Sequence, residues 1–401
     1  MKKLIQSFFA LINSTILIFI LFSCVSNPKT ENTKIEEKTV EPKISTITLT
    51  FTGDIMAHTN VTRMKDFSLI YKDILDITQN DDVTFANFET PVVDDQEYEN
   101  WPNFNAKNAY ALAAMDAGFD AFTLSNNHTN DQGLKGIWAT RDFFASQKEN
   151  GIYSVGLKYE ENGDYTYQII EKNGFTILFM GVTEIYNSSR YIEWFDTTDR
   201  SEATRAKFIE RVKKMREEHP CDLFVLAFHC NEPEYVIPVT DKRKAYYHQL
   251  VDAGVDVVWA NHPHVMQEWE VIKSKENPNE QKVIMYSVGN LISGQRSKRN
   301  YENPAASREY TGESILMQLK FKKTVTKSKD EAKTDDITIS AEKPKVVILT
   351  NHTEGPVGKY DSLIKKLDEN FIESLPSELD KTYYKKRLEL CNEITGKTIW
   401  K

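Results

Sequence analysis

Hydrophobic and polar residues recur along the chain with two different periods, which together predict a mixture of strands and helices. Short apolar or alternating runs, typical of β-strands, lie at 47–51, 83–89, 119–124, 165–172, 175–182, 222–228, 255–259, 266–272 and 283–287. Apolar positions spaced three and four residues apart predict helices at 108–118, 135–148, 200–218 and 242–253. We therefore expect an α/β fold.

Two stretches predict antiparallel pairs within this fold. Asn173-Gly174 joins two strand-like runs and is a strong signal for a tight hairpin. A polar insertion at 322–336 separates the runs 314–321 and 337–349, which are expected to pair as a long hairpin. Hairpins mixed with βα units favour a mixed sheet, or two facing sheets, over a purely parallel doubly wound fold.

The C-terminal part has a mostly helical pattern at 361–390, which we assign to packing rather than chemistry. The predicted organisation is a domain over 46–350 that contains a flexible insertion at 323–336. A helical extension over 351–401 is expected to pack on that domain.

The N-terminus reads as a targeting segment. Lys2 and Lys3 precede an apolar stretch at 4–22, and Leu-Phe-Ser before Cys24 resembles a bacterial lipobox. We predict a lipoprotein signal peptide over 1–24, lipidation of Cys24, and a disordered, polar tether over 25–45. The alternative is an uncleaved membrane anchor. Both predictions place the rest of the chain outside the cytoplasm, as a membrane-anchored protein.

Composition narrows the function classes. The formal net charge of −9 provides no basic field for nucleic acid or for an anionic membrane surface. Beyond Cys24 the chain has three cysteines, an odd number that does not indicate a disulfide framework. Cys221 and Cys230 flank one predicted strand, which would hold them too far apart to bond.

Residues of the types that commonly bind metals follow several predicted strands. Gly53 permits a turn after 47–51, and Asp54 and His58 follow it. Open α/β folds bind ligands at this edge, and Asp with His suits borderline divalent metals. The chain has eight histidines, of which five follow predicted strands: His58, His128, His229, His262 and His264. A single residue of this kind is more often a helix cap or a structural histidine, so the prediction depends on the recurrence. The other three, His219, His248 and His352, are expected to be surface or structural residues.

The run 125–133, Ser-Asn-Asn-His-Thr-Asn-Asp-Gln-Gly, is the most specific stretch. The Asn127 carboxamide oxygen is a candidate metal ligand, and His128 beside it is a candidate general acid or charge stabiliser. Asp131 is expected to orient the His128 imidazole and to fix its tautomer. The alternative is an Asn-rich turn.

Further candidates follow other strands. Asn87 and Glu89 are two residues apart on a strand and share a face, with Glu89 the candidate carboxylate that bridges two metals. His229 follows the most apolar strand, where a polar side chain is costly unless it has a purpose. We assign Asn87, Glu234 and Asn290 to substrate contacts. The alternatives are ordinary loop or turn residues.

His262-Pro263-His264 adds two imidazoles to this set. In an extended segment the two side chains would face opposite ways, whereas a bent loop would point both at a pair of metals. Together the strand-end residues predict a two-metal site, of the kind that clamps the attacking and leaving oxygens of a phosphoryl displacement.

These motifs, in this order, resemble the capsule synthesis protein CapA family, which is associated with poly-γ-glutamate capsule biosynthesis. The resemblance covers about 46–293 and is carried by Gly53-Asp54 with His58, Asn87-Phe88-Glu89-Thr90-Pro91, Ser125-Asn126-Asn127-His128, His229 with Glu234-Tyr235, Asn261-His262-Pro263-His264-Val265 and Tyr286-Ser287-Val288-Gly289-Asn290.

The resemblance implies a fold, a cofactor and residue roles. The wider calcineurin-like metallophosphoesterases have a four-layer α/β/β/α sandwich of two facing mixed sheets around a dinuclear centre. By position, the ligands of two divalent ions (manganese, zinc or iron) would be Asp54, His58, Glu89, Asn127, His229, His262 and His264. His128 would be the catalytic histidine, with Asp131 beside it.

Three functions are compatible with these features. The first is a lipid-anchored envelope protein that makes, exports or attaches an anionic polymer such as poly-γ-glutamate, within a capsule synthesis complex and through a hydrolase-like site. The second is an extracytoplasmic metallophosphoesterase that acts on envelope phosphoesters. The third is a non-catalytic scaffold that binds polymer.

Overall fold

The computed structural model describes residues 41–273, 281–328, 334–355, 360–397 and 399–400. The predicted signal peptide, Cys24 and most of the predicted tether lie outside these residues. In the described part, no helix combines the length and the apolar character that crossing a membrane requires.

The first sheet contains nine described strands and mixes parallel with antiparallel pairs. They are β1 (Lys43–Ile55), β2 (Val83–Phe88), β3 (Ala121–Thr123), β4 (Tyr153–Val155), β11 (Asn290–Ile292), β12 (Glu313–Thr326), β13 (Asp336–Ala341), β14 (Lys345–Glu354) and β15 (Asp361–Lys366). Their order is β15-β14-β12-β1-β2-β3-β4, with β11 beside β1 and β13 beside β12. The run from β1 to β4 is parallel, and β12 is antiparallel to β1.

The second sheet contains seven described strands and is also mixed. They are β5 (Tyr167–Lys172), β6 (Phe175–Thr183), β7 (Leu223–His229), β8 (Val257–Asn261), β9 (Trp269–Lys273), β10 (Gln281–Met285) and β16 (Ile399–Trp400). Their order is β16-β9-β10-β8-β7-β6-β5. The hairpin predicted at Asn173-Gly174 is confirmed, because β5 and β6 pair antiparallel across it.

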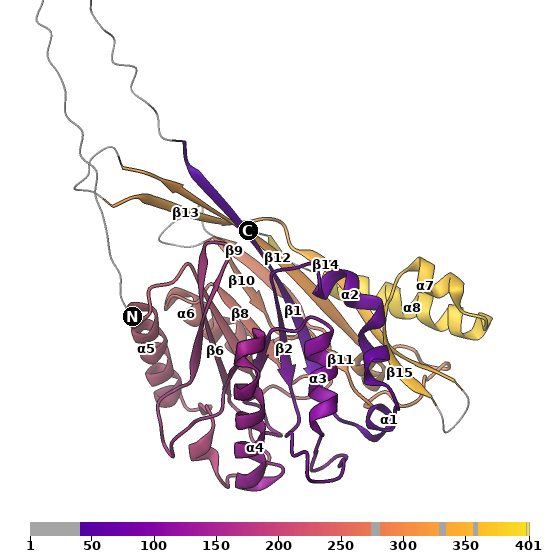
Figure 1. The fold of residues 1–401 in the computed structure, drawn as a ribbon. Helices are drawn as coiled ribbons and strands as arrows, with labels where there is room; N and C mark the ends of the chain where they lie inside the picture. Colours follow the sequence, from indigo (N-terminus) through magenta and orange to yellow (C-terminus); the bar gives the residue numbers. More distant parts are fainter. Residues whose placement is uncertain (1–40, 274–280, 329–333, 356–359, 398, 401) are drawn as a thin grey trace, which may run out of the picture. The chain divides into compact units, whose positions relative to one another are not determined.

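Helices cover the outer faces of the two sheets (Figure 1). The α-helices are α1 (Thr59–Thr62), α2 (Leu75–Thr78), α3 (Asn108–Asp116), α4 (Gly133–Ser146), α5 (Glu202–Glu218), α6 (Asp241–Asp252), α7 (Glu369–Ser374) and α8 (Glu378–Thr395). The 3₁₀ segments are η1 (Phe67–Ile74), η2 (Lys148–Asn150), η3 (Ile192–Trp194) and η4 (Ser307–Gly312).

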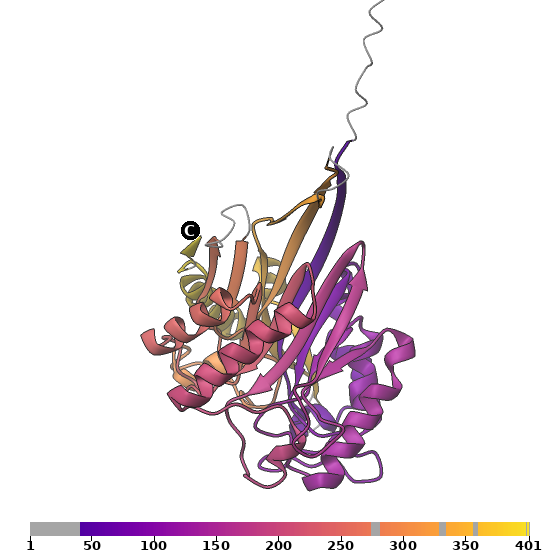
Figure 2. The same ribbon diagram turned by 90° about the vertical axis from the view of Figure 1, so that its left-hand side faces the viewer.

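Three apolar layers hold these four layers of structure together. Phe88 of β2 packs with Phe144 of α4 on the outer face of the first sheet. On the outer face of the second sheet, Phe228 of β7 packs with Tyr247 of α6. Between the sheets, Phe85 of β2 contacts Phe179 of β6 and Trp259 of β8. The predicted α/β/β/α sandwich is confirmed, and Figure 2 shows the facing sheets between helices of the two halves.

The structure differs from the sequence prediction mainly in its C-terminal third. Residues 361–366 form β15 rather than helix, because they pair antiparallel with β14 and extend the first sheet. The predicted domain end at 350 therefore falls inside β14. The run 337–349 is two strands, β13 and β14, which pair with successive parts of β12, so the predicted long hairpin contains a break.

Other boundaries of strands and segments also differ from the sequence prediction. The strand β1 begins at Lys43, inside the predicted tether, and β12 reaches Thr326, inside the predicted insertion. The helical segments between Thr59 and Thr78, as well as the short strands β4 and β11, were not predicted.

Candidate metal centre

The site lies where parallel strands of both sheets end. Asp54 is in β1, Glu89 follows β2, and His229 ends β7. The two sheets are tied together nearby by Trp259 of β8, whose indole N–H donates to the Thr52 carbonyl of β1 at 3.0 Å. The polar strand ends of two sheets thus meet in one place, as the sequence predicted.

A bulge aims Asp54 into the site. The pairing register of β1 shifts next to Asp54 against both β2 and β11. Gly53 lies against the backbone of Gly289, where an added Cβ would come within 1.8 Å of the carbonyl oxygen. A bulge re-aims a side chain, and the close backbone approach explains why glycine occupies position 53.

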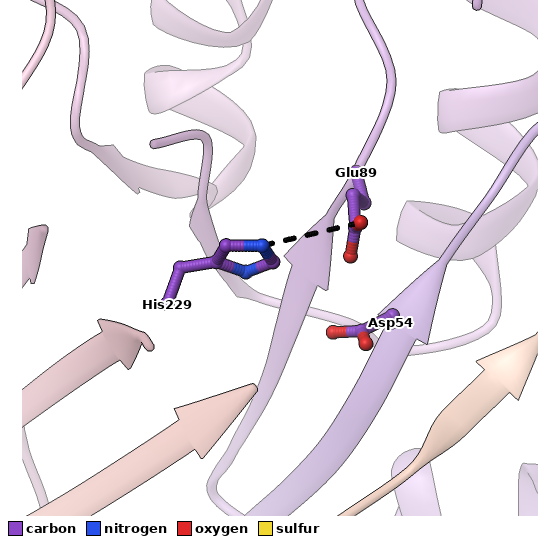
Figure 3. Close-up of side chains that lie close together, drawn as sticks. All are labelled: Asp54, Glu89 and His229. Carbon is purple, nitrogen blue, oxygen red and sulfur yellow. Dashed lines mark ion pairs between the residues drawn. The ribbon is translucent and has the colours of Figure 1, made fainter. Parts of the chain in front are cut away.

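Asp54, Glu89 and His229 form the centre of the cluster (Figure 3). One ligand atom from each lies within 4.8 Å of the other two, and the Glu89 Oε1 to His229 Nε2 distance is 4.0 Å. All three side chains are buried, with relative exposures of 0, 0 and 2 %. This group of one imidazole and two carboxylates could hold a metal ion.

Two more predicted ligands contact this centre. His264 Nδ1 lies 3.1 Å from Asp54 Oδ2, and His264 Nε2 lies 3.7 Å from Glu89 Oε1. Asn127 Oδ1 lies 2.9 Å from His229 Nε2. Glu89 Oε1 is therefore close to the Nε2 atoms of two imidazoles, one at the end of β7 and one on the loop after β8.

The unpartnered atoms of the cluster fit a bound cation. Among the described residues, Glu89 Oε1, His58 Nδ1 and His262 Nδ1 are buried and have no hydrogen-bond partner. A buried carboxylate oxygen without a partner is costly, and a cation bound at that oxygen would remove the cost. Carboxylate, imidazole and amide donors are the ligands that borderline divalent metals accept, so the residues present fit the expected cofactor.

The electrostatics agree with this fit. The pKa of Glu89 is raised well above its usual value, first by burial and then by the negative charge of Asp54. Burial lowers the pKa values of His229 and His262, and lowers that of His58 to about 3. These imidazoles are therefore neutral at pH 7, the form that binds metal.

The loop His262-Pro263-His264 is bent, as one of the two predicted alternatives requires. His262 and His264 have φ angles of 105° and 57°, in the left-handed region that few non-glycine residues adopt. The ring centroids of the two histidines are 5.7 Å apart, and Tyr235 N–H donates to the Pro263 carbonyl at 2.9 Å. Backbone strain of this kind persists where surrounding contacts hold it, and it is concentrated at functional sites.

His128 is held as the sequence predicted. Its Nδ1 lies 2.6 Å from Asp131 Oδ2, which also accepts the backbone N–H of Phe104 at 2.8 Å. The His128 ring packs on Phe104 with centroids 4.6 Å apart. Because Asp131 occupies Nδ1, Nε2 is the ring nitrogen left for proton exchange.

The predicted substrate contacts lie in different surroundings. Asn87 is fully buried, and its amide donates to Asp54 Oδ1 at 2.7 Å and to Glu89 Oε2 at 3.1 Å. Asn290 is also buried, and its Oδ1 lies 2.9 Å from His264 Nδ1. Both amides are bound to candidate ligands, so their contacts support a positioning role. Glu234 alone is exposed, and its charge contributes to the raised pKa of Glu89.

The prediction missed two amides that support the site. Asn126 donates to the Phe88 carbonyl at 3.0 Å and to Asn87 Oδ1 at 3.3 Å. Asn261, at the end of β8, places its amide 3.2 Å from Asp54 Oδ1. Each is next to a predicted ligand in the chain, Asn126 before Asn127 and Asn261 before His262. Their position after a predicted strand could therefore have indicated a role at the site.

The remaining histidines and cysteines lie in structural surroundings. His219 packs on the ring of Tyr167, His248 bonds to Glu270, and His352 Nδ1 bonds to the Tyr384 hydroxyl. Cys221, Cys230 and Cys391 are free thiols, in agreement with the prediction that no disulfide joins the first two.

Comparisons with known proteins cover the larger part of the chain, including the candidate metal centre. The family model described as bacterial capsule synthesis protein PGA_cap matches residues 48–295. The capsule biosynthesis protein CapA of Bacillus anthracis is 28% identical over 261 residues, which are 62% of this chain and 60% of that protein. The PGA biosynthesis protein CapA of Bacillus subtilis (strain 168) is 26% identical over 303 residues, 72% of this chain and 73% of that protein. The crystal structure of a hypothetical protein from Thermus thermophilus aligns with a TM-score of 0.40 and 16% identity, over 75% of this chain and 98% of that one.

Proposed function

The chain belongs to the bacterial capsule synthesis protein PGA_cap family, and we propose that it acts in the synthesis, export or attachment of an anionic capsule polymer such as poly-γ-glutamate. The names of the two Bacillus relatives support a role with such a polymer. The observation that carries the chemical part is Glu89 Oε1, which is buried, unpartnered and close to the imidazoles of His229 and His264.

The proposed location is outside the cytoplasm, on the membrane surface. It rests on the sequence of the N-terminal segment, where Cys24 would carry the lipid and the polar residues after it would form a tether. A lipid anchor would keep the site near a polymer that is made or exported at the membrane.

The proposed site holds two divalent metal ions. Asp54, Glu89 and His229, which lie close enough together to hold an ion, would bind them together with Asn127 and His264. His58 and His262, with their unpartnered buried nitrogens, would complete the set. When bound, the metal ions would activate a water and stabilise the charge that develops at the reacting centre.

The chain's own residues have separate tasks at this site. Asp131 holds the His128 ring by accepting a hydrogen bond from Nδ1. His128 Nε2 would then donate a proton to the leaving atom of the bond that is hydrolysed. Asn87 and Asn290 hold Asp54, Glu89 and His264 in place through the amide contacts described above.

The test combines metal content with turnover in the purified full-length protein. Metal per chain is measured by mass spectrometry after reconstitution with Mn²⁺ or Zn²⁺, and hydrolysis is measured on a generic phosphodiester and on poly-γ-glutamate. Asn127→Ala is expected to lose metal and activity. His128→Ala is expected to keep its metal and lose activity, because it is a proton donor and not a ligand. His219→Gln serves as the control, because this histidine packs on a tyrosine outside the site.

The outcomes separate three functions. About two metals per chain and turnover of the polymer would support the proposal. Turnover confined to phosphodiesters would favour an envelope metallophosphoesterase instead. Absence of metal after reconstitution would refute the metal centre and leave a polymer-binding scaffold.

A further inference from the structure

The arginines of the described structure fall into two groups, those with a carboxylate partner and those without one. All twelve arginines lie in the described residues. Eight have a carboxylate oxygen within 4.0 Å of the guanidinium, namely Arg141, Arg205, Arg211, Arg216, Arg243, Arg296, Arg299 and Arg387. Among the described residues, Arg63, Arg190, Arg200 and Arg308 have no such partner. All four are exposed.

Arg63 lies in a cavity that adjoins the candidate metal centre. The cavity has a volume of about 370 Å³, and one of its walls is His58. Its other lining residues include Asn60, Asn100 and Ser297, with no Asp or Glu among the described lining residues. A cavity of this size, rich in hydrogen-bond donors and without negative charge, suits a small anionic group.

Arg308 lies beside the same centre on a different segment. Its guanidinium lies 4.7 Å from the centroid of the Tyr235 ring, and its Nε donates to the Gln295 carbonyl at 3.2 Å. The Gln295 side chain in turn accepts a hydrogen bond from Asn290 at 2.9 Å. Arg308 is therefore linked through Gln295 to Asn290, the residue that contacts His264.

Arg190 is on a loop that forms hydrogen bonds with the segment that contains His128. Asn130 donates to the carbonyls of Ser188 and Arg190 at 2.8 and 2.6 Å, and Asn187 N–H donates to the Asn127 carbonyl at 3.1 Å. Arg200 lies farther along the same part of the chain.

Three of the four arginines without a carboxylate partner thus lie on segments that adjoin one site, although the protein as a whole carries a net charge of −9. Carboxylates are abundant in such a chain, and each of the other eight arginines pairs with at least one of them. Guanidiniums match carboxylates in a planar, two-point geometry. An anionic ligand at this site would supply the missing partners.

We propose that Arg63, Arg190 and Arg308 form a multi-point binding surface for a polymer with closely spaced carboxylates, with one carboxylate seated in the cavity beside His58. The inference rests on the proposed function, since it specifies how the polymer would reach the metal centre.

The test measures binding separately from hydrolysis. Binding of the full-length protein to fluorescent poly-γ-glutamate oligomers is titrated at several salt concentrations, with chelator present so that metal chemistry does not contribute. The variants are R63Q, R190Q, R308Q and the triple variant. R211Q is the matched control, because Arg211, on the outer helix α5, pairs with Asp164 and Glu218. Polyphosphate is the comparison ligand.

Each single variant is expected to bind about two- to five-fold more weakly, the range that one exposed ion pair provides. The triple variant is expected to lose about 10- to 100-fold and to show a weaker dependence on salt, because fewer charges are involved. R211Q should bind as the unmodified protein does. Unchanged binding in the triple variant, or tighter binding of polyphosphate than of polyglutamate, would overturn the inference.

The two proposals can fail separately. If the triple variant loses polymer binding but retains its metal, the arginine surface stands as inferred. If metal is absent from every variant while the arginine variants still lose polymer binding, the proposed hydrolase site fails and the binding surface remains.

Discussion

Glu313, at the start of β12, is fully buried between two guanidinium groups. Its Oε1 bonds to Arg296, and its Oε2 accepts from Arg387 Nε at 2.9 Å. Glu313 and Arg387 are both 0 % exposed. Burial alone would raise the Glu313 pKa, but the charges of Arg296 and Arg387 outweigh it, and the pKa is lowered. The carboxylate is therefore ionised at neutral pH, and Glu313→Gln removes one negative charge with little change in shape.

The size of the expected effect follows from the burial. Removing one partner of a buried ion pair costs about 3–5 kcal/mol, because the remaining charge is left uncompensated. Here two guanidiniums would remain, of which that of Arg296 would keep its hydrogen bond to the Thr350 hydroxyl at 2.8 Å. With an unfolding entropy of about 2.1 cal/mol/K per residue, a unit of this length would lose roughly 4–7 °C in Tm. The cost of about 3–5 kcal/mol is a large part of a typical domain stability of about 5–15 kcal/mol.

Thermal and urea unfolding, followed by circular dichroism, measure the effect. Glu342→Gln is the matched control, because its pair with Lys320 is about half exposed and is worth about 0–1 kcal/mol. An apolar triple variant, R296M/E313L/R387M, is expected to recover much of the stability, because replacing a whole buried ion network removes its desolvation cost. If Glu313→Gln unfolded within about 1 °C of the parent protein, the reasoning about uncompensated buried charge at this position would be wrong.

Three further predictions concern other buried groups. Burial lowers the pKa of His352 to about 4 from 6.5, so the folded protein binds fewer protons than the unfolded chain between these values. Stability is thus expected to fall as the pH drops from 6.5 towards 4, by up to about 3 kcal/mol relative to His352→Gln in urea titrations. Gly53→Ala should destabilise by about 1–3 kcal/mol or more, because the new Cβ would strike the Gly289 carbonyl 1.8 Å away; a normal urea midpoint would contradict this. Trp259→Phe removes the indole bond to the Thr52 carbonyl between the sheets, and a loss of about 1–3 kcal/mol without a change in m-value is expected.

Some features of the site could be predicted because they are local in the chain. A strand followed by Gly53 and Asp54, or by His229, carries its signal within a few residues, since strand periodicity and turn residues act over short distances. The Asn173-Gly174 hairpin and the His128–Asp131 contact, three residues apart, are of the same kind. Parallel strands end at a common edge, so the recurrence of such ends was enough to indicate a shared site.

Other features depend on pairings between distant segments. Residues 361–366 have no strand periodicity of their own and become β15 through the edge of β14. Likewise, the sequence assigned Asn290 to a substrate contact, and only the fold shows it beside His264. Glu313 has no sequence signal that distinguishes it from a surface acid, and the fold buries it between two arginines.

The sequence by itself therefore determined the α/β class, the family resemblance and the residues that end the strands. Only the tertiary structure decided which of them converge, that Glu89 Oε1 lies near two imidazoles, and which arginines lack a partner. Local propensity and periodicity act along a few residues, whereas burial, charge compensation and sheet edges arise when segments far apart in the chain pack together.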